Sequence, residues 1–200
     1  MQTSAFNWSI RGITYAALFG ALFVAFTFIQ IPLGFTPVQI TLANFAIMLT
    51  GALLGGVYGF ISIGAVVLLT AIGLPLVHGA GGIALLTGRT AGFIWAYPFA
   101  ALFIGLIASR IRGRGWKSFV LLFLTIEISG SLLLYVTGIP WFAHVTHYSL
   151  AKSLSLSCYP FLPGDAAKAL LATLIVHQIR VVFPEGILTR KSSPVVPLDA

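Results

Sequence analysis

The chain has 200 residues, of which 58% are hydrophobic and only 8% are charged, and its mean hydropathy is +1.03. Soluble domains carry about a quarter charged residues, so this composition excludes a soluble globular domain and predicts an integral membrane protein. The net charge of +7 does not indicate a nucleic-acid partner, because the basic residues lie at the ends of apolar segments and in one short loop. The single cysteine, Cys158, excludes an internal disulfide framework.

Six apolar segments are long enough to be membrane-spanning helices, which need about 20 residues each. They lie at about 13–31, 38–56, 57–74, 89–109, 118–138 and 164–183. The first is too long for the apolar part of a signal peptide and is predicted to be retained. Only Gly55 and Gly56 separate the second segment from the third, which requires a very tight turn. We therefore predict an all-α bundle of six transmembrane helices that forms one domain over residues 1–190, followed by a polar, disordered tail at 191–200.

The distribution of lysine and arginine orients these spans. With six spans, both termini share one side with the loops after the second and fourth spans. That side holds eight basic residues, namely Arg11, Arg110, Arg112, Arg114, Lys117, Arg180, Arg190 and Lys191, against three on the other, namely Arg89, Lys152 and Lys168. Basic residues favour the cytoplasmic side, so we expect both termini to lie in the cytoplasm and the protein to lie in the cell membrane. The longer connections, 32–37, 75–88 and 139–163, then face outward, and a binding site should open there.

Small residues recur every four positions in the first span, in two registers. One register contains Gly12, Ala16 and Gly20, and the other contains Ala17, Ala21 and Ala25. Such faces let helices approach closely in lipid. The pattern therefore predicts either packing within this bundle or a docking surface for another membrane subunit.

The glycine-rich connection before the fourth span, from Gly73 to Phe93, includes Arg89. It is not a phosphate-binding loop, because it lacks the Gly-Lys-Ser/Thr ending and a preceding strand. Arg89 has two readings that the sequence leaves open. It is either an arginine that extends to the membrane interface or a bidentate clamp for a carboxylate.

Four further polar residues give weaker indications. Glu127 lies in the middle of the fifth span, so it must be protonated or paired across the bundle, as a proton relay or in a structural hydrogen bond. His144 and His147 have the spacing to share a helix face, but no third ligand stands at suitable spacing, so we predict no metal site. His177 is expected to be a packing residue. Because a paired acid set, a serine triad and a nucleotide motif are missing from the sequence, we predict that the chain is not an enzyme and uses no cofactor.

The segment Pro160–Lys168, which reads PFLPGDAAK, opens the last apolar helix. Asp165 and Lys168 are three residues apart and therefore share a helix face. Asp165 follows Pro163-Gly164, which is typical of a turn, and is predicted to lie at or next to the helix N-cap. Lys168 lies in a segment that is expected to be membrane-buried, where a charge is costly and usually functional.

Three stretches together resemble the BioY family, the biotin-binding S-components of energy-coupling-factor (ECF) transporters. They are PVQITL at 37–42, the glycine-rich run from Gly51 to Phe93, and GIPW at 138–141 followed by PFLPGDAAK at 160–168. The resemblance implies a six-helix bundle that encloses one biotin near the outer face. It also implies that Ala17, Ala21 and Ala25 meet a transmembrane coupling subunit that carries two ATPases.

The chemistry of biotin, the ligand that the resemblance implies, suggests roles for residues of this chain. Asp165 would accept from the ureido N–H groups of biotin, while Lys168 and Arg89 would neutralise the valerate carboxylate or polarise the ureido oxygen. Aromatic walls would come from Phe35, Phe93, Tyr97 and Trp141, and Thr41 and Asn44 would add polar contacts. The family glutamine after Thr-Leu is Ala43 here and the second proline is Gln39, so Asn44 is the candidate substitute. Two alternatives remain: an S-component for another small vitamin, and a membrane assembly protein without a ligand in which Asp165 and Lys168 only pair with each other.

Overall fold

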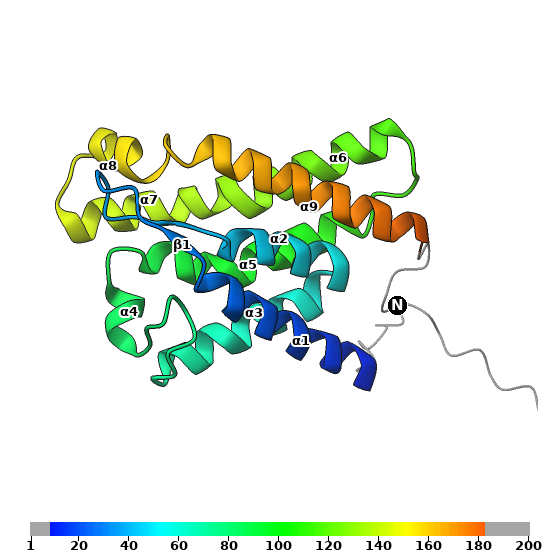
Figure 1. Cartoon of the computed structure of the whole chain (residues 1–200), viewed down its shortest axis with the longest axis horizontal. Coiled ribbons are helices and arrows are strands. Elements are labelled where there is room, and N and C mark those ends of the chain that lie inside the picture. Colours follow the sequence, from blue (N-terminus) through cyan, green and yellow to red (C-terminus); the bar gives the residue numbers. More distant parts are fainter. Residues whose placement is uncertain (1–8, 183–200) are drawn as a thin grey trace, which may run out of the picture.

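The computed structural model describes residues 9–182, which form a mostly helical bundle (Figure 1). The elements are α1 (Ile10–Thr27), β1 (Gln30–Ile31), β2 (Ile40–Thr41), α2 (Ala43–Leu54), α3 (Gly56–Ala71), α4 (Ile83–Thr87), α5 (Ala91–Ala108), α6 (Trp116–Glu127), the π-helical turn η1 (Ile128–Leu132), α7 (Leu133–Thr146), α8 (Leu150–Ser157) and α9 (Leu162–Val182). The predicted helical class is confirmed, apart from the two-residue antiparallel ladder between β1 and β2. The predicted tail at 191–200 lies outside the described residues.

Helix α5 is the centre of the bundle and packs against α2, α3 and α7. Close contact between α2 and α5 depends on glycine, because a Cβ atom built on Gly51 would lie 2.6 Å from the carbonyl oxygen of Ala101. The tight turn predicted between the second and third spans is confirmed. Gly55 alone links α2 to α3, and its φ of +80° is one that L side chains rarely adopt.

The helix lengths fit a membrane protein. Within residues 9–182, three helical stretches are long and apolar enough to cross a bilayer: α1, α5 and the continuous stretch from Trp116 to Thr146. Helices α2 and α3 are apolar but shorter. Large apolar side chains such as Leu68, Ile72 and Val136 lie on the surface, with 67%, 78% and 69% exposure. Exposed apolar groups of this size are stable in contact with lipid.

Several predicted span boundaries were wrong. The first span was expected to reach residue 31, but α1 ends at Thr27, and the second was expected to begin at 38, but α2 begins at Ala43. The segment between them, which includes three residues unfavourable to a helix (Pro32, Gly34 and Pro37), forms the β1–β2 hairpin instead.

The fifth span was expected to end at 138, but its helix continues to Thr146. Gly138 was expected to be the last residue of that span. Instead, Gly138 lies at a helix contact, because a Cβ atom there would be 2.3 Å from Cε1 of Phe93. The expected loop at 139–163 therefore contains the end of α7 and all of α8.

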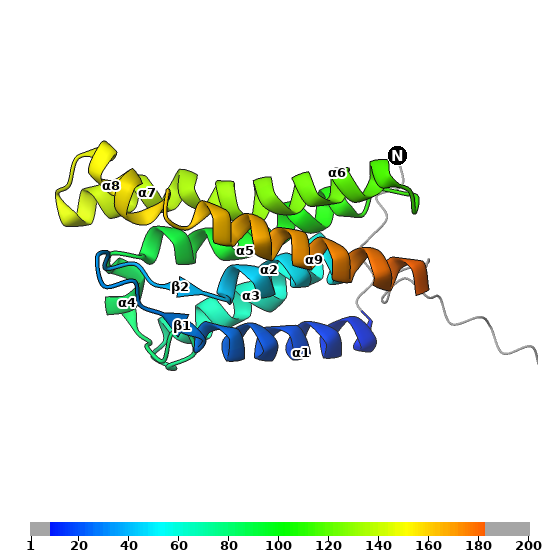
Figure 2. The same ribbon diagram turned by 45° about the horizontal axis from the view of Figure 1, so that its top comes forward.

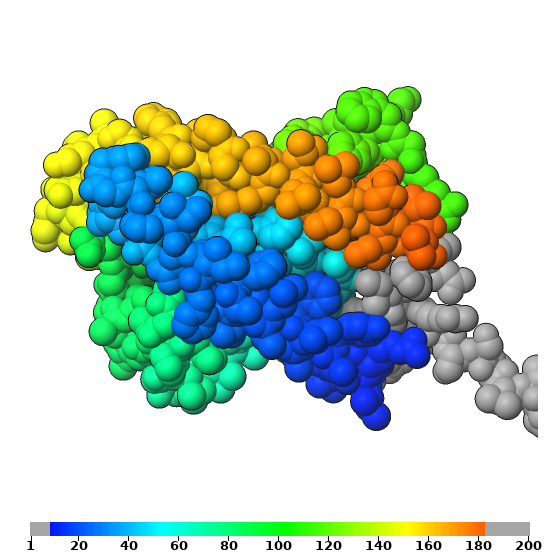
Figure 3. Space-filling model, in the orientation of Figure 1, coloured from blue at the N-terminus to red at the C-terminus, as the bar shows by residue number. Residues whose placement is uncertain are grey.

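The two ends of the bundle differ in character. The beginning of α1, the end of α9 and the basic connection between α5 and α6 lie at one end, and α4, α8 and the β1–β2 hairpin lie at the other (Figures 1 and 2). The hairpin lies against α8 on the surface (Figure 3), where the hydroxyl of Thr36 donates to the carbonyl of Leu156 at 2.7 Å. The hairpin is therefore tied across this end of the bundle.

The two small-residue registers of α1 face different surroundings. Gly12, Ala16 and Gly20 are buried, and Ser62 of α3 donates its hydroxyl to the carbonyl of Ala16 at 2.6 Å. Ala17, Ala21 and Ala25 are exposed. The two readings that the sequence left open thus separate by register: one face packs within the bundle, and the other is exposed on its surface.

Candidate ligand-binding site

A cavity of about 300 Å³ lies within the bundle, near the end that carries the hairpin. Side chains from α2, α5, η1, α7 and α9 line it, together with residues of the hairpin and of the connections before α4 and α5. Its volume is at the small end of the range for ligand pockets, about 300–1,000 Å³. Helix α2 has 12 residues and is therefore about 18 Å long. Asn44, the second residue of α2, lines the cavity, so the N-terminus of α2 reaches it.

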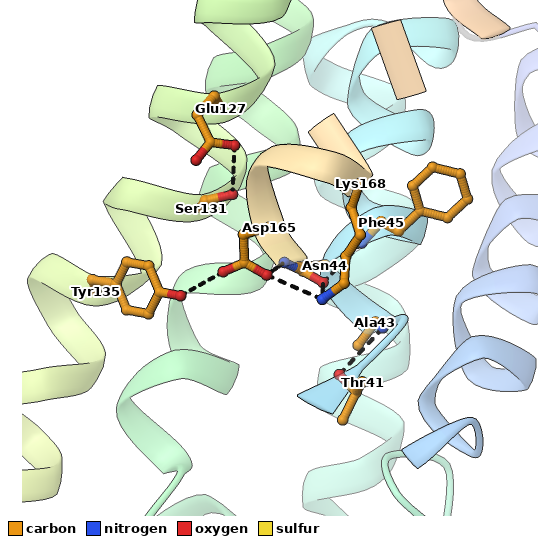
Figure 4. Close-up of polar contacts among 9 residues, drawn as sticks. All are labelled: Thr41, Ala43, Asn44, Phe45, Glu127, Ser131, Tyr135, Asp165 and Lys168. Atoms are coloured by element: carbon orange, nitrogen blue, oxygen red, sulfur yellow. Dashed lines mark hydrogen bonds and ion pairs between the residues drawn. The ribbon is translucent and has the colours of Figure 1, made fainter. Parts of the chain in front are cut away.

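A polar cluster with Asp165 at its centre lies on one side of this cavity (Figure 4). We call this side the charged side, and it comprises Asn44, Tyr135, Asp165 and Lys168. Its Oδ1 atom accepts from Asn44 Nδ2 at 2.8 Å and from Lys168 Nζ at 3.0 Å. Its Oδ2 atom accepts from the hydroxyl of Tyr135. Asn44 Oδ1 in turn accepts from Lys168 Nζ at 3.0 Å. The side chains of Lys168 and Asp165 are only 13% and 8% exposed, so the ion pair is largely withdrawn from water.

Three helices position this cluster. Asn44 is the second residue of α2, Tyr135 lies near the start of α7, and Asp165 and Lys168 lie on one face of the first turns of α9. The predicted N-cap role of Asp165 was wrong, because α9 begins at Leu162 and the Asp165 N–H already donates to the carbonyl of Phe161 at 2.9 Å. The carboxylate is thus free to face the interior.

The cluster retains hydrogen-bonding capacity for a ligand. Lys168 has three N–H groups and uses two of them, on Asp165 and Asn44. The Tyr135 hydroxyl donates to Asp165 and can still accept, and a carboxylate has about four acceptor positions. The arrangement can therefore bind a neutral group that presents both N–H donors and a carbonyl acceptor.

A second polar contact lies next to the charged side. Ser131 is buried in η1, lines the cavity, and donates to Glu127 Oε2 at 3.1 Å (Figure 4). Of the two roles left open for Glu127, a structural hydrogen bond is observed. The π-helical turn brings Gly130 against α2, because a Cβ atom there would lie 2.7 Å from Met48 Cγ. Such turns are frequent at functional sites.

Aromatic rings form part of the apolar wall. Phe93, Tyr97, Tyr135 and Phe161 line the cavity. Phe93 packs edge to face on Tyr135, with ring centroids 6.2 Å apart, and Tyr97 packs edge to face on Phe23 at 5.8 Å. These contacts between rings hold the aromatic side chains in place.

Two polar side chains form what we call the α1 side of the cavity, Gln30 and His78. Both donate to the carbonyl oxygen of Thr27, which is the last residue of α1. Gln30 donates from Nε2 and His78 from Nδ1, and each distance is 3.0 Å. His78 adopts a φ of +57° in the connection between α3 and α4. Burial lowers the pKa of the His78 imidazole, and its hydrogen bond to Thr27 opposes that shift.

The structure brings together most of the predicted binding residues. Six of them line the cavity: Thr41, Asn44, Phe93, Tyr97, Asp165 and Lys168. Three others do not line it. Arg89 is exposed at the beginning of α5, beside the lining residue Thr90, and Phe35 is 62% exposed on the hairpin. Trp141 donates its indole N–H to the carbonyl of Gly88 at 2.9 Å and packs against α5 at Gly92.

The structure also adds lining residues that sequence reasoning missed: Gln30, His78, Ser131, Tyr135 and Phe161. For Tyr135 and Ser131 a weak signal existed, since polar side chains within an apolar span face the bundle interior more often than lipid. Gln30 and His78 gave no such signal, because their position depends on how the hairpin and the connection fold back onto α1.

The histidines singled out by their spacing are not gathered into a metal site. His144 and His147 are exposed, and His177 packs edge to face on Phe119 with ring centroids 5.6 Å apart. Among residues 9–182, His, Cys, Asp and Glu form no group of three that could hold a metal ion.

An apolar helical bundle with a preformed cavity and a buried ion pair defines a membrane protein that binds a small molecule. The chain belongs to the BioY family, whose model matches residues 1–185. It is 36% identical to the biotin transporter BioY of Rhizobium etli over an alignment of 181 residues, and the match covers 88% of this chain and 96% of that relative. It is 37% identical to the probable biotin transporter BioY of Bacillus subtilis, over 82% of this chain and 88% of that relative.

A solved structure has the same fold. It is the crystal structure of the S-component for biotin from an ECF-type ABC transporter, which matches with a TM-score of 0.80 and 33% sequence identity. The match covers 86% of this chain and 92% of that one. The family resemblance inferred from the motifs is therefore confirmed.

Proposed function

We propose that this protein captures biotin at the outer face of the cell membrane as the substrate-binding subunit of an ECF-type transporter. The observation that carries the proposal is the cluster of Asp165, Lys168, Asn44 and Tyr135 on one side of the cavity. The similarity to a biotin transporter and to an S-component for biotin supports biotin as the ligand.

The ureido group of biotin matches the capacity of the charged side. It carries two N–H donors and one carbonyl. The carbonyl accepts the third N–H of Lys168, and the N–H groups donate to Asp165 and to the Tyr135 oxygen. Because Asp165 already balances the charge of Lys168 at 3.0 Å, Lys168 polarises the ureido oxygen rather than neutralising the valerate. The thioether ring then lies against the aromatic wall.

Arg89 acts at the entrance in this proposal. Its guanidinium is exposed beside Thr90, so it draws the negatively charged ligand toward the cavity from solution. Exposed charges of this kind act mainly on the association rate.

The proposed topology has six crossings, formed by α1, α2, α3, α5, the continuous helix of α6, η1 and α7, and α9. Both termini are cytoplasmic. Two observations support it. The beginning of α1 and the end of α9 lie at the same end of the bundle (Figure 2), and that end carries Arg11, Arg110, Arg112, Arg114, Lys117 and Arg180. The cavity then opens to the outside.

The proposed partners are a transmembrane coupling subunit and two ATP-binding subunits, which supply the energy of uptake. The exposed face of Ala17, Ala21 and Ala25 docks the coupling subunit. The chain itself is proposed to hydrolyse no nucleotide and to need no cofactor.

Equilibrium binding of labelled biotin to the detergent-purified chain tests the proposal, with wild type measured beside Lys168→Ala and Asp165→Asn. We expect one-to-one binding that is lost in Lys168→Ala. Asp165→Asn should weaken biotin more than an analogue whose ureido N–H groups are replaced. Equal losses for the two ligands would remove Asp165 from ureido recognition. No binding to the wild type would contradict biotin capture and leave a different vitamin, or assembly without a ligand, as the function.

A further inference from the structure

We propose that His78, together with Gln30, binds the carboxylate of the ligand on the α1 side of the cavity, and that His78 takes up a proton when the carboxylate binds. This inference rests on the proposed function, because it concerns the far end of a biotin molecule whose ureido group lies on the charged side.

The hydrogen bonds fix the orientation of both side chains. The Thr27 carbonyl can only accept, so the His78 Nδ1 atom at 3.0 Å must carry a proton. Nε2 is then the ring atom left for a ligand. Gln30 Nε2 spends one of its two N–H groups on the same carbonyl and keeps the other. Both residues line the cavity, so two polar groups face it from the end of α1.

The backbone holds His78 in place. The Thr27 hydroxyl shares its proton between the carbonyls of Val24, at 2.7 Å, and Leu76, at 3.0 Å. The N–H of Gly82 donates to the carbonyl of Thr70 at 2.7 Å. These bonds tie the connection that carries His78 to α1 and α3. His78 adopts the left-handed conformation, which is uncommon for a residue with a Cβ atom. A connection anchored this way presents the imidazole at a set position.

The surroundings of His78 leave its charge open to control by a ligand. Its hydrogen-bonding partner is neutral: it is the carbonyl of Thr27 of α1, which also accepts from Gln30 of β1. Across the described residues, the ionisable groups on the other walls of the cavity are Tyr97 of α5, Tyr135 of α7, and Asp165 and Lys168 of α9. Glu127 of α6 bonds to the lining residue Ser131, and Arg89 is exposed at the start of α5. The negative charge of Asp165 is balanced by Lys168.

The pKa of His78 determines whether ligand affinity rises or falls with pH. Burial lowers the pKa of His78, so the imidazole is neutral at pH 7 until a carboxylate binds. A bound carboxylate favours the imidazolium and raises that pKa. Binding is therefore strongest below the lower pKa and weakens as the pH rises through the higher one. Capture would be favoured on an acidic outer face.

The experiment measures the affinity of the full chain from pH 5.5 to pH 8.5 for two ligands, biotin and biotin amide, which lacks the carboxylate. Wild type should bind biotin about tenfold more tightly at the acidic end, as expected for a hydrogen bond to a charged group, and the amide equally at all pH values. Titration calorimetry in buffers of different ionisation enthalpy should detect proton uptake with biotin and none with the amide. This measurement needs no variant.

Two variants then test whether His78 is the group that takes up the proton. In His78→Asn the amide tolerates the left-handed backbone and can still donate to Thr27, but it does not titrate, so the pH dependence should vanish. His177→Asn, a change to a half-buried histidine on α9, should keep it. A pH-independent biotin affinity in the wild type, or an unchanged pH dependence in His78→Asn, would overturn the inference while leaving biotin capture intact. No biotin binding by the wild type would overturn both.

Discussion

The charged side and the α1 side of the cavity are built differently. On the charged side, four side chains from three helices bind one another, and Asp165 alone takes part in three hydrogen bonds. On the α1 side, Gln30 and His78 come from a hairpin and a connection, and their shared partner is a backbone carbonyl. Helices fix a polar cluster more rigidly than loops do. We expect the charged side to determine which ligand binds and the α1 side to adjust how tightly it is held.

The largest loss of stability and of biotin binding should come from removing one partner of the buried ion pair between Asp165 and Lys168. Lys168→Met leaves Asp165 without its cation, and breaking a buried pair costs about 3–5 kcal/mol, so both the melting temperature and biotin binding should fall. The double change Asp165→Asn with Lys168→Met should recover most of the stability, because neither charge is left alone, but not the binding. Thermal unfolding and biotin titration of both variants in detergent test this. Recovery of binding in the double variant would show that the pair is only structural.

A smaller loss is expected when one hydroxyl is removed from the charged side. Tyr135→Phe keeps the ring that packs on Phe93 but removes the bond to Asp165. A hydrogen bond to a charged group contributes about 1.5–3 kcal/mol, so biotin affinity should fall by about tenfold or more. Tyr97→Phe is the matched control, since Tyr97 lines the same cavity and packs on Phe23. Equal affinities in Tyr135→Phe and wild type would remove Tyr135 from the site.

The charged side was largely predictable from sequence, and the α1 side was not. Asp165 and Lys168 are scarce charges three residues apart in an apolar helix, so their shared face follows from helical geometry alone. Asn44 required the family resemblance as well. By contrast, His78 and Gln30 are separated from α1 by turns, and their common partner is a carbonyl, which the amino-acid sequence does not distinguish.

The wrongly predicted span boundaries have the same cause, since they also depend on contacts that the amino-acid sequence does not reveal. Composition and periodicity predict that a segment is helical, but not whether a glycine ends it. Gly55 does end α2, with a φ of +80°, whereas Gly138 lies inside α7 against the ring of Phe93. The difference lies in the neighbouring helix, which is a tertiary contact. The placement of Trp141 follows from this, because it lies on the continued helix rather than in a loop.

Only a small loss of biotin affinity is expected when Arg89 is removed from the entrance of the cavity. Arg89→Ala removes an exposed cation, and exposed charges contribute about 0.2–1 kcal/mol, so the dissociation constant for biotin should rise less than about fivefold. The loss should lie in the association rate and should shrink as salt is added. Stopped-flow binding at low and high salt distinguishes this from a direct contact, which would change the dissociation rate instead. Biotin amide, which is uncharged, serves as the matched ligand.

The smallest effect on affinity should come from the exposed face of α1. Ala21→Leu adds a bulky side chain at an exposed position, so biotin binding and melting temperature should equal those of the wild type. If this face docks a coupling subunit, the same change blocks close helix approach and should abolish biotin uptake by cells and co-purification of the partner subunits. Leu18→Ala, a change on the same exposed surface of α1, is the control that should preserve both. Normal uptake in Ala21→Leu would place the docking surface elsewhere. Lost binding in the purified variant would instead mean that α1 positions the α1 side of the cavity through Thr27.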